Sequence, residues 1–303
     1  MKQLHLVASI VVMALHATGV AASGVSIPCD DGTRYYNLAR EAGASRDFVK
    51  AAEWLQKSVA ACDSYPAWHL MGTAYQRQRN LQESLAAYEQ AVAHAGSQDQ
   101  AALSMARYGQ VLALNGQRFE ALTMLERAME AHSNPPSWMR ENARELDLSL
   151  AEAPVSSDSI KRSLASQEFG LLAMNQIENQ ANVRGETKAR IQIPINYQLN
   201  SVELDERTSD NIHELGKVLA SQEHEGKTFT LVGHTDVRGT WAHNLALSER
   251  RAEAARAILE TTFPPLSGRL RVVGAGEAKP KYPGEDLPES EHRLNRRLEV
   301  IVN

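Results

Sequence analysis

Apolar residues recur at helical spacing through the first half of the chain, from about residue 32 to residue 149. This stretch is rich in Ala, Leu, Glu and Gln and poor in β-branched residues, so its period predicts α-helices. Two consecutive prolines then interrupt the pattern, and a last helix is expected from Trp138 to about Leu150. The pattern therefore predicts an all-α domain over residues 29–150.

A spacing of large and small residues repeats inside this all-α domain. In its central copy, Trp68, Met71 and Tyr75 surround Gly72 on a first helix, and a second helix carries Ser84, Tyr88 and Ala91. A small residue lets the two helices of a hairpin approach, and the large residues fill the space between them. We therefore expect Trp68 and Tyr88 in the core. Weaker copies lie on both sides, at Tyr35, Leu38, Ala39, Ala42, Ala51 and Leu55 and at Tyr108, Gly109, Leu112, Ala121, Leu125 and Ala128.

This spacing resembles the tetratricopeptide repeat, whose helical hairpins stack in tandem. The resemblance implies an array of about three hairpins that binds a peptide or a partner protein on a concave surface. The alternative is that the hairpins serve only as a spacer. The identity of the partner does not follow from the sequence.

The second half of the chain alternates between two periods. Ile191, Ile193, Ile195, Tyr197 and Leu199 alternate mainly with Gln and Asn, which predicts a strand with one buried face. A helical period follows through Ile212, Leu215 and Leu219. The remaining expected elements are a strand at 228–232, a helix at 245–260 with Asn244 as its N-cap, and strands at 270–273 and 298–302. Strands that alternate with helices predict an α/β two-layer sandwich with a mixed sheet over residues 189–303.

Residues 151–188 are expected to link the two domains. The stretch begins with a run of Pro, Ser and Asp that is typical of an inter-domain linker. Residues 160–177 are too apolar for a fully disordered linker, and we expect a short helix there that docks on one domain.

The N-terminus indicates export. Lys2, an apolar run from Leu6 to Leu15 and the small residues before Ser23 are typical of a secretory signal peptide over residues 1–22. The apolar run is shorter than the ~20 residues that a spanning helix needs, although an uncleaved anchor remains an alternative. The expected location is the periplasm, in association with the cell wall or the outer membrane. The net charge of −5 argues against binding to nucleic acid.

The two cysteines of the chain, Cys29 and Cys62, stand at opposite ends of the first predicted hairpin. In an exported protein an even number of cysteines favours a disulfide, and the ends of an antiparallel hairpin lie side by side. Two free thiols are the alternative. A metal site is not expected, because no histidine pair accompanies the cysteines.

One segment of the second domain brings opposite charges together. Asp236 follows a predicted strand, and Arg251 lies on the helical stripe that should face the sheet, where an unpaired cation is costly. An acid and a base at the mouth of a pocket can receive a zwitterion, since the carboxylate takes an ammonium and the guanidinium takes a carboxylate. The alternative is that Asp236 and Arg251 form only a structural salt bridge.

The ordered motifs of this domain resemble the OmpA-like peptidoglycan-binding domain. They are Gly-His-Thr-Asp-x-x-Gly from residue 233, Asn244, Leu-Ser-x-x-Arg-Ala from residue 247, Gly-x-Gly-Glu-x-x-Pro from residue 274 and Asn-Arg-Arg-Leu-Glu from residue 295. The resemblance implies that Asp236 and Arg251 hold the diaminopimelate of the peptidoglycan stem peptide, with contributions from Asn244, Thr235 and Arg297. Arg296 or Arg297 is expected to be a solvated charge on the strand face. His243 stands where the family usually has tyrosine.

No catalytic residues, metal ligands or cofactor are expected. His234, Asp236 and Ser248 do not form a catalytic triad, because no Gly-x-Ser-x-Gly turn surrounds Ser248. The glycine-rich segment at 274–277 lacks the Gly-Lys-Ser/Thr ending of a phosphate-binding loop. The sequence therefore favours a non-catalytic periplasmic adaptor that binds peptidoglycan with one domain and a protein partner with the other. The alternatives are a repeat-based scaffold of an envelope complex with weak wall tethering, and a wall-modifying enzyme.

Overall fold

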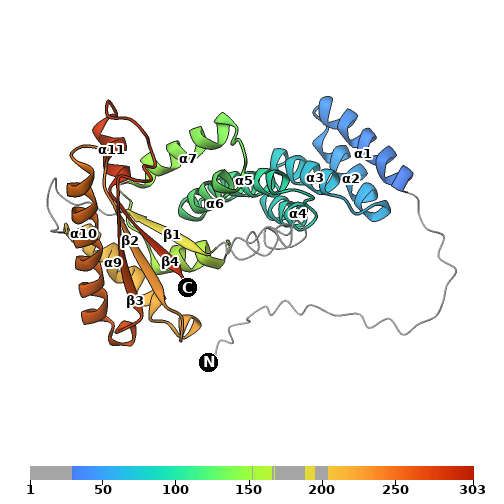
Figure 1. The fold of residues 1–303 in the computed structure, drawn as a ribbon. Coiled ribbons are helices and arrows are strands. Elements are labelled where there is room, and N and C mark those ends of the chain that lie inside the picture. The colour runs from blue at the N-terminus through green and yellow to red at the C-terminus, as the bar shows by residue number, and fades with distance from the viewer. Residues whose placement is uncertain (1–28, 152, 166, 168–187, 195–203) are drawn as a thin grey trace, which may run out of the picture.

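The chain folds into a helical domain followed by an α/β domain, which confirms the predicted fold class (Figure 1). The computed structural model describes residues 29–151, 153–165, 167, 188–194 and 204–303. The expected signal peptide at 1–22 lies outside the described residues.

The helices of the first domain pair as hairpins: α1 packs on α2, α3 on α4 and α5 on α6, and α7 closes the series against α6. The predicted helical array is therefore confirmed. Its elements are α1 (Cys29–Ala44), α2 (Phe48–Ala61), α3 (Tyr65–Arg77), α4 (Leu81–Ala93), α5 (Gln98–Leu114), α6 (Arg118–Ala131) and α7 (Ser137–Leu150).

Each of the three hairpins turns through one residue in the left-handed region, directly before the N-cap of its second helix. These residues are Arg46 (φ 60°), Arg79 (φ 62°) and Gly116 (φ 80°). The left-handed conformation costs a residue with a Cβ on the order of 1–2 kcal/mol, whereas glycine adopts it freely. The hairpins thus share one turn geometry, although only the third has the residue that suits it best.

Small residues allow the hairpin helices to approach, as the sequence predicts. A Cβ on Gly72 would lie 2.7 Å from the fully buried ring of Tyr88, and a Cβ on Gly109 would lie 3.1 Å from the backbone of α6. The expectation for Trp68 is wrong in part, since this side chain is only partly buried. Its indole N–H donates to Asp63 and its ring stacks on His94, so it lies at the rim of the hairpin.

The predicted disulfide joins Cys29 to Cys62, with the two Cα atoms 5.0 Å apart. Cys29 is the first residue of α1 and Cys62 is the C-cap of α2. The bridge therefore closes the open end of the first hairpin.

The α/β domain is built on a four-stranded sheet in the order β1-β4-β2-β3. Among the described strands, β2 and β3 pair in parallel and the other pairs are antiparallel, so the mixed sheet predicted from the sequence is confirmed. Helices α9 and α10 pack against each other, with α9 on β1 and α10 on β2 and β3 (Figure 1). The elements are β1 (Arg190–Pro194), α9 (Glu206–Leu219), β2 (Phe229–His234), α10 (Trp241–Thr262), β3 (Leu270–Gly276), α11 (Glu289–Asn295) and β4 (Arg297–Val302).

The described part of the expected linker is folded. Residues 157–165 are helical, which agrees with the first part of the helix expected within 160–177; residues 166 and 168–177 lie outside the described residues. Ile160 and Leu164 lie in the same apolar cluster as Ile191 and Ile193 of β1. The backbone N–H of Val155 donates to Asn211 of α9 at 3.0 Å. This segment therefore docks on the α/β domain.

The two domains are also joined by buried charges. Lys281, in the loop before α11, forms ion pairs with Glu126 of α6 at 2.5 Å and with Asp147 of α7 at 2.7 Å. Burial opposes the charge of Lys281, but the two carboxylates raise its pKa. Tyr282 donates to Asp147 at 2.9 Å.

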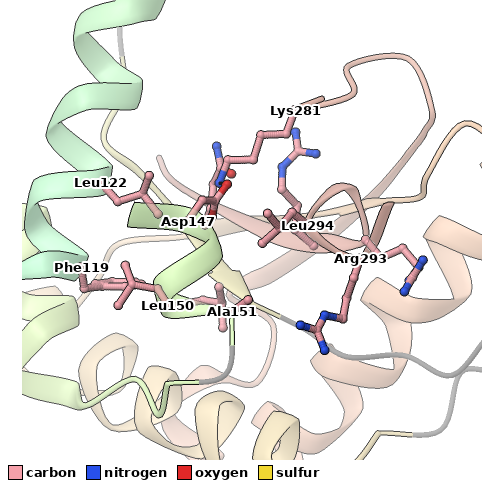
Figure 2. A pocket seen from close by; sticks show the side chains of 12 residues that line it. Phe119, Leu122, Asp147, Leu150, Ala151, Lys281, Arg293 and Leu294 are labelled. Carbon is pink, nitrogen blue, oxygen red and sulfur yellow. Dashed lines mark ion pairs between the residues drawn. The ribbon is translucent and has the colours of Figure 1, made fainter. Parts of the chain in front are cut away.

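Figure 2 shows Lys281 and Asp147 beside a cavity of about 30 Å³ lined by residues of both domains. This space is suited to a water molecule rather than a ligand.

Gly72→Ala should destabilise the helical domain. The added methyl group cannot avoid the Tyr88 ring, and overpacking a core costs about 1–3 kcal/mol, more than the ~1 kcal/mol that alanine gains over glycine in a helix. Gly43→Ala is the matched control, because its Cβ meets nothing within 4 Å. Urea unfolding should show a lower midpoint for Gly72→Ala only; equal midpoints would refute this packing.

Lys281→Met should weaken the junction of the two domains. It leaves two neighbouring buried carboxylates without their cation, and breaking a buried ion pair costs about 3–5 kcal/mol. Lys279→Met removes an exposed lysine two residues earlier and should cost little. Thermal unfolding followed by circular dichroism should separate the two variants. If they unfold together, the buried pairs do not stabilise the junction.

Candidate functional site

The candidate site forms where β2 leaves the sheet and α10 begins. The loop turns through Gly239 (φ 108°), and Thr240 caps α10 by accepting a hydrogen bond from the backbone N–H of His243 at 3.3 Å. The expectation that Asn244 caps this helix is wrong, because α10 begins four residues earlier than expected, at Trp241. The hydroxyl of Thr240 already serves as the cap.

Asn244 instead holds the loop. Its amide donates to the backbone carbonyls of Asp236 at 3.4 Å and Arg238 at 3.1 Å, and to the carboxylate of Glu277. Because Asn244 is 2% exposed, these bonds fix the path of the loop around Asp236.

Glycines on two strands bring α10 unusually close to the sheet. A Cβ on Gly233 would lie 2.1 Å from the backbone oxygen of Ser248, and a Cβ on Gly274 would lie 2.8 Å from that of Leu245. The backbone N–H of Gly276 donates to the hydroxyl of Ser248 at 2.9 Å. The glycine motifs therefore set the position of the loop that carries Asp236.

Asp236 is buried and bound by two guanidinium groups. Arg238 donates from Nη2 to Oδ2 at 2.7 Å and from Nε to Oδ1 at 3.2 Å, and its backbone N–H donates to Oδ1 at 3.1 Å. Arg296 donates from Nη1 to Oδ2 at 2.7 Å. Burial raises the pKa of Asp236, but the hydrogen bonds from both arginines outweigh it and lower the pKa to about 2. The carboxylate is therefore ionised at neutral pH.

A second carboxylate completes a cluster of four charges, called here the Asp236 cluster: Asp236, Arg238, Glu289 and Arg296. Glu289, the first residue of α11, accepts from Arg238 at 2.8 Å and from Arg296 at 2.9 Å. Asp236 and Arg296 are buried, whereas Arg238 and Glu289 are 38% and 64% exposed. The cluster thus has a fixed inner pair and an outer pair at the surface.

The other predicted residues take different positions. The Thr235 hydroxyl is buried and lacks a hydrogen-bond partner among the described residues, while its backbone N–H donates to Gly276 at 2.9 Å. Arg251 is 2% exposed on α10, on the face that packs toward the sheet. His243 is exposed near the start of the same helix.

The structure corrects the expectation for the paired arginines, since neither is solvated. Arg296 and Arg297 are each 8% exposed and point to different partners. Arg296 reaches Asp236, whereas Arg297 donates to the backbone carbonyls of Asn295 at 3.4 Å and Lys279 at 3.1 Å. Burial lowers the pKa of Arg297. Sequence reasoning assigned Arg297 to the site and missed Arg238, Glu289 and Arg296.

A buried pair lies next to the site on the sheet. His234 at the end of β2 contacts Glu299 of β4 at 3.2 Å, and Arg190 of β1 donates to the same carboxylate at 3.2 Å. Despite burial, these partners lower the pKa of Glu299 to about 2. Together, His234, Glu299 and Arg190 link β2, β4 and β1 next to the loop.

This arrangement is suited to recognition of a ligand that carries both charges. Carboxylates and guanidiniums alternate in the Asp236 cluster, so an ammonium and a carboxylate of one ligand could each exchange with an internal partner. In the described part of the chain, no cluster of three or more His, Cys, Asp or Glu side chains could hold a metal ion. None of the described helices combines the length and the apolar character that crossing a membrane requires.

Comparison with known proteins supports the motif-based resemblance. Residues 196–293 match the model of the OmpA family, so the C-terminal domain is OmpA-like. Outer membrane porin F of Pseudomonas aeruginosa is 31% identical over 113 residues, 37% of this chain and 31% of the relative. A peptidoglycan-associated lipoprotein of Legionella pneumophila is 40% identical over 78 residues, 26% of this chain and 43% of the relative. The chain thus spans less than half of the length of either relative.

A solved structure of the peptidoglycan-associated lipoprotein from Burkholderia pseudomallei covers 42% of this chain and 98% of its own, with 25% identity and a TM-score of 0.32.

Asp236→Asn should make the stability of the folded protein less dependent on pH in the acidic range. A carboxyl with a lowered pKa in the folded protein stabilises it above its unfolded pKa, about 3.9, and this contribution is lost as the pH falls toward 2. The variant should therefore show a shallower fall of the unfolding midpoint between about pH 4 and pH 2. Asp210→Asn, at an exposed position of α9, should retain the wild-type slope. An unchanged slope in Asp236→Asn would contradict the ion pairs of this carboxylate.

Proposed function

We propose that the C-terminal domain binds peptidoglycan without cleaving it, through the diaminopimelate of the stem peptide. The observation that carries this proposal is the ionised, buried carboxylate of Asp236 within a cluster of alternating charges. Diaminopimelate has an ammonium and a carboxylate on one carbon, and the cluster offers the complement of each. The relatives named peptidoglycan-associated lipoproteins add independent support.

In this proposal the outer pair of the Asp236 cluster opens to admit the ligand. Arg238 is the exposed partner of Asp236, and its other contact is to the exposed Glu289. The ammonium of the ligand replaces the guanidinium of Arg238 at Asp236, while Arg296 keeps the carboxylate ionised. The displaced Arg238 is then available to the ligand carboxylate. Each charge-assisted hydrogen bond contributes about 1.5–3 kcal/mol.

The remaining predicted residues have distinct roles in the proposal. Arg251 supplies the guanidinium for the ligand carboxylate from α10, and Thr235 offers its hydroxyl beside Asp236. Asn244 acts through the loop, because its amide bonds to the backbone at Asp236 and Arg238. Arg297 acts from further away, since its guanidinium donates to the backbone carbonyls of Asn295 and Lys279.

The second half of the proposal concerns the helical domain. It presents tandem hairpins to a protein partner, and the wall contact locates that partner in the periplasm beside the cell wall or the outer membrane. The second candidate function is a repeat-based scaffold with weak wall tethering. It is favoured by the extent of the helical domain, which occupies residues 29–150 of the chain.

Co-sedimentation with purified sacculi tests the wall half of the proposal. Wild type should sediment with diaminopimelate-type sacculi, and Asp236→Asn and Arg251→Gln should each bind about tenfold more weakly, because each loses at least one charge-assisted contact. Asp210→Asn is the control for a lost carboxylate, and Arg250→Gln is the control for a lost arginine, since both positions are exposed.

The ligand provides a second control. Sacculi whose stem peptides carry lysine lack the extra carboxylate of diaminopimelate, and wild type should bind them more weakly. Circular dichroism spectra should establish that each variant is folded. Retained sedimentation of both site variants would rule out this site, and new muropeptides after incubation would overturn the non-catalytic assignment.

A further inference from the structure

A large groove lies on the helical domain, away from the Asp236 cluster. It is a groove of about 760 Å³, within the range of about 300–1,000 Å³ that is usual for ligand sites. Its walls come from α3 and α5, which are the first helices of two successive hairpins, together with α6 and α7. This is one continuous face of the array.

Positive charge dominates this groove. Four arginines line it against one acidic residue, Glu145; the arginines are Arg77, Arg79, Arg107 and Arg118. Among the residues that the structure describes, none of these four arginines forms an ion pair. In contrast, Arg238 and Arg296 of the Asp236 cluster are paired with carboxylates. The groove therefore has a net positive charge that the described chain leaves uncompensated.

One of these arginines, Arg107, is held in position by its side-chain contacts. The guanidinium of Arg107 lies 4.3 Å from the centre of the Trp138 ring, and its Nη1 donates to Gln110 at 2.9 Å. Arg79 occupies the left-handed turn between α3 and α4, where glycine would avoid a conformational cost. Burial, and to a lesser extent the charge of Arg107, lowers the pKa of His69 to about 4.

The rest of the lining indicates a peptide rather than a chain of phosphates. The amides of Gln76, Gln110 and Asn142 can pair with both the N–H and the C=O groups of an extended backbone. Leu114 is 49% exposed and offers an apolar contact to a side chain of the ligand. A carboxylate such as Glu145 can accept a hydrogen bond from a peptide N–H, a donor that a chain of phosphates lacks.

We propose that this groove binds an extended acidic peptide segment of a partner protein, with Arg77, Arg79, Arg107 and Arg118 receiving its carboxylates. The inference rests on the proposed function, in which the helical domain binds a partner, and it specifies the chemistry of that partner. Guanidinium groups make two-pronged contacts with carboxylates, so spaced Asp or Glu residues match arginines spread along a groove.

Fluorescence anisotropy with the full-length chain tests the groove. The probe is a short labelled peptide in which glutamate alternates with serine, and the comparison peptide has glutamine at each glutamate. The chain should bind the glutamate peptide and not the glutamine peptide. Binding should weaken as NaCl is raised, because the screening length falls from about 10 Å at 0.1 M to about 3 Å at 1 M.

A matched pair of variants isolates the groove. Arg79→Glu and Arg46→Glu both reverse an exposed arginine at positive φ, in equivalent turns of successive hairpins, so they carry the same backbone cost. Only Arg79 lines the groove. Arg79→Glu and Arg118→Glu should each weaken the glutamate peptide at least about fivefold, since each variant loses an attraction and adds a repulsion, whereas Arg46→Glu should bind as wild type does.

Three outcomes would overturn the inference. They are equal binding of the glutamate and glutamine peptides, equal losses in Arg79→Glu and Arg46→Glu, and displacement of the peptide by inorganic polyphosphate at a lower charge concentration than by free glutamate peptide.

Sacculus binding separates this test from that of the wall site. Arg79→Glu should sediment with sacculi as wild type does, and Asp236→Asn should retain the peptide. Failure of one assay then leaves the other proposal intact.

Discussion

The close contact of α10 with β2 and β3 is the constraint on which the candidate site depends. Gly233 and Gly274 have no room for a Cβ, because backbone oxygens of α10 occupy that space. The helix consequently lies low on the sheet, and the loop between β2 and α10 must turn tightly at Gly239. Asn244 can reach back to this loop only from a helix in this position. The placement of Asp236 therefore depends on Gly233 and Gly274, which let α10 lie close to the sheet because they have no side chain.

Much of the fold could be predicted from local pattern. Helical periods and strand alternation each depend on the immediate neighbours of a residue, and the ordered glycine and Asp motifs identified the loop that carries Asp236. The details that failed depend on tertiary structure. Arg296 and Arg297 are adjacent in sequence, and only the end of α11 determines which of them turns toward Asp236. Helix α11 itself is seven residues long, too short to display a period, so the contribution of Glu289 gave no local signal.

The junction of the domains could not be predicted from local pattern either. Lys281 follows a proline in a polar loop, and nothing in its neighbourhood distinguishes it from a solvated lysine. Its partners, Glu126 and Asp147, lie more than a hundred residues earlier on helices of the other domain. A buried cation is favourable only when such partners converge, and this convergence is a property of the folded chain. The segment expected to link the domains likewise contributes apolar side chains to a core.

These buried contacts also define how the chain would carry a mechanical load. The groove is formed partly by α6 and α7, and the same two helices supply Glu126 and Asp147 to Lys281. Arg190 of β1 pairs with Glu130 of α6 at 2.7 Å, and β1 is hydrogen-bonded to β4 at the centre of the sheet. Tension applied to a peptide in the groove would therefore pass through side-chain contacts into the sheet. If both proposed sites are occupied, these contacts would lie on the path between the two ligands.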